Sequence, residues 1–129
     1  MRRVAPLSLV LLAVAAAGCG GSTTYSVEKT RSCFTARGVT LAQVPRADIV
    51  GSSATGGSFA ASFGDNTVKV VFGETEDDAE QIQGAYERFA FANVKAGLAD
   101  VLRRDKNAVM LWQKHPQDSD LSLVSGCLR

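Results

Sequence analysis

The chain has 129 residues, of which 46% are hydrophobic and 21% are charged. This length favours a single domain, and the ordinary composition excludes both an intrinsically disordered chain and a membrane protein with several spans. Without Arg2 and Arg3 at the N-terminus, 12 of the 14 basic side chains remain against 13 acidic ones, a formal charge of −1, so net charge predicts neither nucleic-acid binding nor a polybasic membrane patch.

The first residues have the pattern of an export signal. Arg2 and Arg3 give a positively charged start, and residues 5–17 form an apolar run without any charge. This run is too short to cross a hydrocarbon core, which needs about 20 residues in a helix. The pattern therefore predicts a removable signal peptide rather than a permanent membrane anchor.

The end of this segment carries small residues directly before a cysteine: Ala16, Ala17 and Gly18 precede Cys19. This sequence resembles the lipobox of bacterial lipoprotein precursors, although Ala16 stands where leucine is usual. The resemblance implies lipid attachment to the Cys19 thiol, cleavage after Gly18, and a lipid-anchored location on the extracytoplasmic face of the cell membrane. An ordinary signal peptide cut after Ala17 is the alternative, since small residues also precede that bond.

These observations divide the chain into three parts. Residues 1–18 are the predicted lipoprotein signal peptide, residues 19–25 a short tether, and residues 26–129 a single extracytoplasmic domain. If flexible, the five residues after Cys19 reach only about 12 Å. We therefore expect the domain to lie close to the lipid surface.

Two cysteines remain for the folded domain, Cys33 and Cys127. An even pair in an exported protein predicts a disulfide. Closing so long a loop would stabilise the fold by roughly 4–5 kcal/mol in the chain-entropy treatment. A metal site is disfavoured because His115 is the only histidine, and a thiol-exchange enzyme because there is no Cys-x-x-Cys motif.

The first half of the domain begins with a predicted helix over residues 26–37. Ser26 is its expected N-cap and Gly38 its expected C′ residue. Residues 39–44 are apolar and stop at Pro45, which favours a short strand. Residues 46–57 are rich in glycine, serine and alanine and predict an exposed loop.

A β-hairpin and a helix follow. Apolar residues alternate over 59–63 and again over 68–72, with a turn at 64–66, so one face of the hairpin should be apolar. Thr75 then begins a predicted helix that runs to about Ala90, with Asp78 placed for a capping box. Ala79, Ile82, Tyr86 and Phe89 recur at helical spacing and should form its buried face.

The last part predicts a loop at 95–97, a second hairpin over 100–104 and 107–113 that turns at 105–106, and a helix over 118–128. The second strand of this hairpin is apolar on both faces, which suits a central position. The order α-β-β-β-α-β-β-α favours an α+β two-layer sandwich, with a largely antiparallel sheet of two hairpins plus a short strand, and three helices. The disulfide would then join the first helix to the last.

Catalytic motifs are sparse. The sequence has no Gly-x-Ser-x-Gly elbow and no phosphate-binding loop. His115, beside Pro116, is interpreted as an exposed loop residue, and Asp118 is the only acid nearby in sequence that could orient it. The acids at 74–80 are explained by the dipole at the start of a helix, since they lack the spacing of a calcium loop.

Two surface features have both a structural and a functional interpretation. Arg103, Arg104 and Lys106 form a basic cluster at the predicted hairpin tip, where they are either solvated or in contact with acidic lipid headgroups or cell-wall polymer. Phe91 is expected in the core, with a partner surface as the alternative.

The sequence therefore predicts a non-enzymatic, lipid-anchored binding or accessory module of the bacterial cell envelope, without a cofactor or metal. Its membrane contact would be the lipid at Cys19, and no nucleic-acid partner is expected. Two alternatives remain open. One is a small envelope hydrolase that uses His115 or dispersed acids, and the other is a structural or inhibitory partner of another envelope protein.

Overall fold

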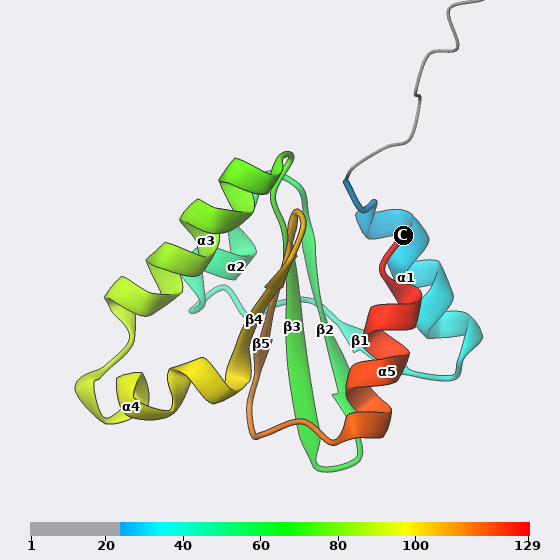
Figure 1. Ribbon diagram of the computed structural model, residues 1–129. Coiled ribbons are helices and arrows are strands. Elements are labelled where there is room, and N and C mark those ends of the chain that lie inside the picture. The colour runs from blue at the N-terminus through cyan, green and yellow to red at the C-terminus, as the bar shows by residue number, and fades with distance from the viewer. Residues whose placement is uncertain (1–23) are drawn as a thin grey trace, which may run out of the picture.

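The computed structural model describes residues 24–129, which fold around an antiparallel sheet with the strand order β1-β2-β3-β5-β4 (Figure 1). Each strand pairs antiparallel to its neighbour. The strands are β1 (Thr40–Ala42), β2 (Ser58–Phe63), β3 (Asn66–Phe72), β4 (Leu102–Asp105) and β5 (Ala108–Trp112). The helices are α1 (Val27–Ala36), α2 (Ile49–Ser52), α3 (Glu76–Phe89), α4 (Ala92–Val101) and α5 (Asp118–Cys127).

One face of the sheet carries α1 and α5, and this pair covers the larger core (Figure 1). Phe34 of α1 packs edge-on against Phe59 of β2, with ring centroids 5.2 Å apart. Full burial of each such ring stabilises the fold by roughly 1.5–3 kcal/mol. The buried members of this core are Phe34, Phe59, Ala61, Val68, Val70, Phe72, Ala108, Met110, Trp112, Val124, Cys127 and Leu128.

The other face carries α2, α3 and α4 over a smaller core (Figure 1). Val71 and Val109 point to this side because neighbouring strand residues alternate between the faces. Its buried members are Val71, Ala79, Tyr86, Leu98, Leu102 and Val109. The side chains of β3 are therefore buried on both faces over its last three residues.

The predicted class is confirmed, as are the first hairpin and the two helix starts. Ser26 accepts a hydrogen bond from the N–H of Lys29 at the start of α1, and Thr75 and Asp78 form the reciprocal capping box of α3. At the other end of α1, Gly38 has φ +76°. Its N–H and that of Val39 bond back to carbonyls of the last turn, which is a Schellman motif.

Two predicted loops are wrong, because each contains a helix. The loop over 46–57 contains the single turn of α2, which depends on contacts distant in sequence. The loop at 95–97 lies inside α4, although Gly97 suggests a break and no side chain caps the helix. Tertiary packing of Leu98 holds α4 in place and delays the start of β4 to Leu102. The hairpin turn is also one residue later than expected, at Lys106 and Asn107.

Two aromatic side chains expected in the core are on the surface. Phe89 is 73% exposed at the last turn of α3, and Phe91 is 80% exposed just before α4. The helical spacing placed Phe89 on the buried face, but the chain turns away from the sheet there to enter α4. Tyr86, one turn earlier, is the last side chain of α3 that reaches the core.

A polar network fixes α2 to both the sheet and α3. The Asp48 carboxylate, whose side chain is 9% exposed, lies 2.6 Å from the Lys69 ammonium. It also accepts hydrogen bonds from the Tyr86 hydroxyl at 3.0 Å and from the Gly51 N–H at 2.9 Å. Gly51 has no room for a side chain, since a Cβ there would lie 2.7 Å from the Tyr86 oxygen.

This network shifts two pKa values in opposite directions. Burial alone would raise the pKa of Asp48, but the hydrogen bonds from Gly51, Lys69 and Tyr86, together with the Lys69 charge, hold it below its usual value. Burial raises the pKa of Tyr86, and the neighbouring Asp48 carboxylate raises it further. The ionised carboxylate and the neutral phenol are thus the stable pair.

We expect Asp48→Asn to lower the free energy of unfolding by about 2–3 kcal/mol near neutral pH, because it removes the charge that Lys69 and Tyr86 both contact. The folded pKa of Asp48 lies below the unfolded value of about 3.9, so its stabilisation is present above that pH and is lost as pH falls through the folded pKa. Urea unfolding across this pH range measures the difference between the two proteins. Asp65→Asn, at an exposed ion pair, is the control and should change stability little. An Asp48→Asn effect that stays constant down to strong acid would contradict this account.

Candidate functional site

The described surface has a polar groove at one end of the sheet, between the β2–β3 turn and the connection from β5 to α5. Its volume is about 520 Å³, within the range of small-ligand sites. We call it the polar groove. It is lined by Phe63, Gly64, Asp65, Asn66, Lys114, His115, Gln117 and Asp120.

Asn66 joins the two walls of the polar groove through hydrogen bonds. Its amide oxygen accepts hydrogen bonds from the N–H groups of Thr67 at 2.9 Å and Lys114 at 3.0 Å. Its amide nitrogen donates to the Lys114 carbonyl at 3.2 Å. Asn66 is only 6% exposed. As the first residue of β3, it forms hydrogen bonds with the backbone of Lys114, just beyond β5. These bonds couple the position of the β2–β3 turn to that of Lys114.

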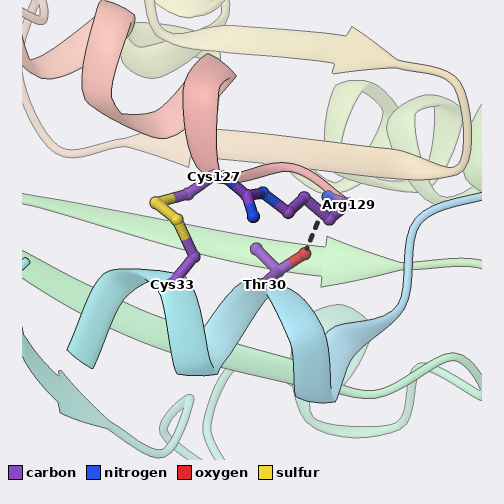
Figure 2. The surroundings of a disulfide bond; sticks show 4 residues. All are labelled: Thr30, Cys33, Cys127 and Arg129. Carbon is purple, nitrogen blue, oxygen red and sulfur yellow. Dashed lines mark hydrogen bonds between the residues drawn. A yellow bond between two sulfur atoms is a disulfide. The ribbon is translucent and has the colours of Figure 1, made fainter. Parts of the chain in front are cut away.

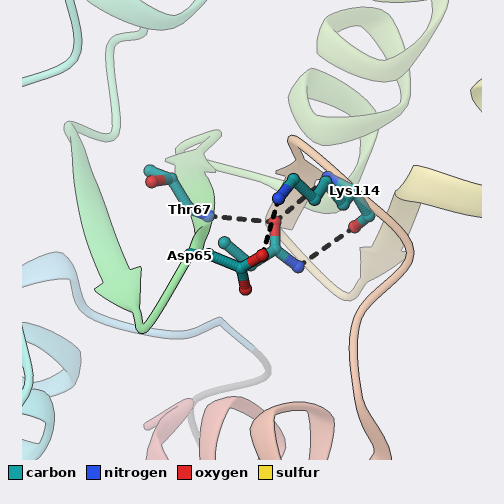
Figure 3. A network of polar contacts seen from close by, with 4 residues as sticks. Asp65, Thr67 and Lys114 are labelled. Atoms are coloured by element: carbon teal, nitrogen blue, oxygen red, sulfur yellow. Dashed lines mark hydrogen bonds and ion pairs between the residues drawn. The ribbon is translucent and has the colours of Figure 1, made fainter.

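An ion pair lies on the rim above this junction. The Lys114 ammonium is 2.7 Å from the Asp65 carboxylate (Figure 3). The hydrogen bond from Lys114, and then its charge, lower the pKa of Asp65. Both side chains are exposed, so water screens the pair and it contributes little to stability. The two charges are consequently available to a ligand.

His115 is exposed, as predicted, but its acidic partner is not Asp118. Nδ1 of His115 lies 2.7 Å from a carboxylate oxygen of Asp100, and the two side chains are 66% and 56% exposed. Asp100 belongs to α4, the helix that the sequence pattern did not predict. This missed helix explains why sequence proximity suggested the wrong partner. Asp100 thus contacts one of the two ring nitrogens of His115.

The polar groove is lined by side chains that form hydrogen bonds and by charges of both signs. Besides the half-buried Phe63, the lining includes the acids Asp65 and Asp120, the cation Lys114 and the amide Gln117. Such a lining suits a polar, uncharged or zwitterionic ligand with one apolar face. Among residues 24–129, no three His, Cys, Asp or Glu side chains are grouped closely enough to hold a metal ion.

The acidic run lies apart from the polar groove, at the start of α3. Glu76, Asp77 and Asp78 occupy its first turn, where they complement the positive end of the helix dipole. Asp78 also takes part in the capping box, where its carboxylate accepts a hydrogen bond from the N–H of Thr75. These positions agree with the dipole interpretation.

The predicted basic cluster is divided by the strand that carries it. Arg103 and Arg104 are neighbours in β4 and so point to opposite faces. Arg104 donates to the Gln83 side chain of α3 at 2.9 Å, whereas the Lys106 ammonium lies 5.0 Å from the centre of the Tyr25 ring. The three cations do not form one patch.

The disulfide between Cys33 and Cys127 is present, and it joins α1 to α5 as expected (Figure 2). The two Cα atoms are 5.4 Å apart. Close to it, the N–H of Arg129 lies 3.4 Å from the Thr30 hydroxyl oxygen, and the Ser26 N–H bonds to the Arg129 carbonyl. The segment after α5 is thus fixed along α1.

Cys19, the predicted signal peptide and most of the tether lie outside the described residues. Within residues 24–129, no helix has the length and apolarity required to cross a membrane.

Comparison of the chain with protein-family models, curated proteins and solved structures finds no match.

We expect the Cys33→Ala/Cys127→Ala double variant to lose up to about 4–5 kcal/mol of unfolding free energy, because the unfolded chain regains the entropy of an open loop. Urea unfolding of both proteins, with and without reductant, measures the loss. Reductant should shift the wild type to the midpoint of the double variant and leave the variant unchanged. Without reductant, the intact mass should be two hydrogens below that of the free dithiol. Two free thiols in exported protein would contradict the expectation.

Proposed function

We propose that this chain is a non-enzymatic binding module of the bacterial cell envelope, anchored by lipid on Cys19 to the extracytoplasmic face of the membrane. The observation that carries the proposal is the Cys33–Cys127 disulfide. Stable disulfides belong to oxidising compartments, and this one uses both cysteines other than Cys19. The leader pattern of residues 1–18 supports the same location.

The placement of the polar groove supports a binding role. Residue 24 and Arg129 lie toward one end of the sheet, while the β2–β3 turn and the start of α5 lie at the other (Figure 1). A tether attached at the first end leaves the polar groove pointing away from Cys19. A ligand in the envelope space could then reach it without competing with the anchor.

A small hydrolase is the second candidate, and the His115–Asp100 pair favours it. A carboxylate on Nδ1 fixes the ring so that Nε2 can accept a proton from water, as the acid does in a catalytic triad. Two features favour binding instead. The pair is open to solvent, which weakens its electrostatics, and no serine or cysteine lines the polar groove as a nucleophile.

We expect Cys19→Ser to leave the membrane fraction and to lose incorporation of labelled fatty acid, because it lacks the thiol that would carry the lipid. Ser22→Ala, three residues later, is the matched control and should remain membrane-bound and labelled. Fractionation of cells and gel fluorescence measure both properties. Cys19→Ser protein that stays membrane-bound and is processed normally would refute the anchor.

We expect the chain to bind a cell-envelope polymer without turnover, and Gln117→Trp to weaken that binding at least tenfold by filling the polar groove. Gln81→Trp, on the exposed surface of α3, is the matched control and should bind normally. Sedimentation with peptidoglycan and with anionic wall polymer measures binding, and release of soluble fragments measures turnover. Turnover by the wild type that His115→Ala abolishes would instead establish the hydrolase.

A further inference from the structure

Three cations surround a second hollow, on the α1–α5 side of the molecule. Lys29 and Arg37 of the α1 segment and Arg129 after α5 line a volume of about 530 Å³ beside the disulfide. Figure 2 shows Arg129 next to Cys127 and facing α1. Arg31 does not belong to this group, because residues two positions apart point to different sides of a helix, and its guanidinium lies 5.8 Å from the centre of the Phe59 ring. We call Lys29, Arg37 and Arg129 the α1 cationic face.

These charges are not neutralised by neighbouring acids. None of the ion pairs found among residues 24–129 includes a member of the α1 cationic face. Glu28 is the one acidic side chain that lines the hollow, and it accepts a hydrogen bond from the Ser26 hydroxyl at 3.1 Å. A net positive charge therefore remains on this surface.

On the opposite side of the sheet, the start of α3 is acidic. It exposes Glu74, Glu76, Asp77 and Glu80, and α3 lies across the sheet from α1 (Figure 1). The near-neutral net charge of the domain predicts no polybasic patch, but it sums local groups of unlike sign. Because these acids and cations are separated, a charged surface favours one orientation of the domain over the others.

The position of the tether adds a second, independent constraint. The described residues begin at Thr24, and α1 starts at Val27, so only the seven residues 20–26 separate Cys19 from the helix that carries Lys29 and Arg37. Whatever surface holds Cys19 must lie close to α1. That surface meets the domain either at the end where residue 24 lies or along α1 itself.

We propose that the α1 cationic face lies against the anionic phospholipid headgroups of the membrane, so that the domain rests on its α1 side. This inference rests on the proposed lipid anchor at Cys19. The side chains of Lys29, Arg37 and Arg129 offer N–H donors and positive charge to phosphate groups at the edge of the open hollow that they line. An end-on arrangement would instead bring Glu74, Glu76 and Asp77 toward the same negative surface.

The size of the effect follows from the surface potential of an anionic leaflet. Each lysine or arginine near the surface contributes about 1 kcal/mol, which is roughly a fivefold change in partitioning. Removing two members of the α1 cationic face should therefore weaken partitioning roughly 25-fold. The attraction acts within a Debye length and should decline as salt is raised.

The first test uses the full chain with Cys19→Ser, so that lipid cannot contribute. We expect it to bind vesicles of phosphatidylcholine and phosphatidylglycerol more tightly than vesicles of phosphatidylcholine alone. Arg2 and Arg3 of the leader also attract anionic lipid, but they are the same in every variant, so the loss between variants measures the α1 cations. Lys29→Ala/Arg37→Ala should remove a large part of this difference. Arg88→Ala/Lys95→Ala, which removes two exposed cations on the α3–α4 side, is the matched control and should retain it. Equal losses in the two double variants would overturn the proposal.

The second test uses the unmodified chain on the same two kinds of vesicle. Lysine acetylation followed by mass spectrometry should show Lys29 protected on the anionic vesicles alone, with Lys95 equally reactive on both. Lys29 that reacts equally on both would overturn the proposal.

The proposed lipid anchor and the proposed α1 cationic face can fail separately. If Cys19 carries no lipid while the Cys19→Ser chain still binds anionic vesicles through α1, the anchor is refuted and the α1 cationic face stands. If Cys19 carries lipid but the Cys19→Ser chain does not bind anionic vesicles through α1, only the proposal for the α1 cationic face is refuted.

Discussion

The pairing of β3 with β5 is the constraint on which the rest of the structure depends. It joins two hairpins that are otherwise local, with Val68 opposite Trp112 and Phe72 opposite Ala108. Asn66 fastens one end of this pairing through Lys114. Asn107 fastens the other, where its amide nitrogen donates to the Gly73 carbonyl at 3.0 Å. Each asparagine is buried. Each forms hydrogen bonds with backbone groups that would otherwise be buried without a partner.

The same two asparagines connect the sheet to the polar groove and to the entry of the chain. Asn66 sets the distance between the walls of the polar groove. Asn107 also holds the entry of the chain, since its amide oxygen accepts the Tyr25 N–H at 2.6 Å and its nitrogen donates to the Tyr25 carbonyl. The start of the described chain is thus fixed to the end of the sheet that is distant from the polar groove. A tether that begins at a fixed point restricts how the domain can lie on a membrane.

Local patterns were sufficient to predict much of this fold. Alternation over 59–72 gave the first hairpin, and the residues Ser26, Gly38 and Thr75 placed helix ends within one or two positions, because caps and turns depend on side chains a few residues apart. The disulfide followed from counting cysteines. These signals are short-range or compositional, so they do not require knowledge of the tertiary structure.

The errors have the opposite origin. α2 is one turn long and is held by Lys69 and Tyr86, which are far from Asp48 in sequence. α4 has Gly97 at its middle and buries little besides Leu98, so its stability comes from packing that no local pattern reports. Missing α4 also produced the wrong partner for His115, since Asp100 approaches only when that helix is formed. The division of Arg103 from Arg104 needed no tertiary information, because side chains also alternate between faces in the strand predicted over 100–104.

The distribution of charge was the least predictable property and has the largest consequence for function. Net charge sums over the chain, but a membrane or a ligand meets one face at a time. The sheet separates α1, with Lys29 and Arg37, from the acidic start of α3 (Figure 1). The disulfide then fixes α1 to α5, so the hollow beside it keeps Lys29 and Arg37 next to Arg129. If the α1 side lies on lipid, the polar groove remains at the free end of the sheet, because Asn66 and Asn107 hold groove and chain entry at opposite ends of β3. Orientation and ligand access are then two results of the same strand pairing.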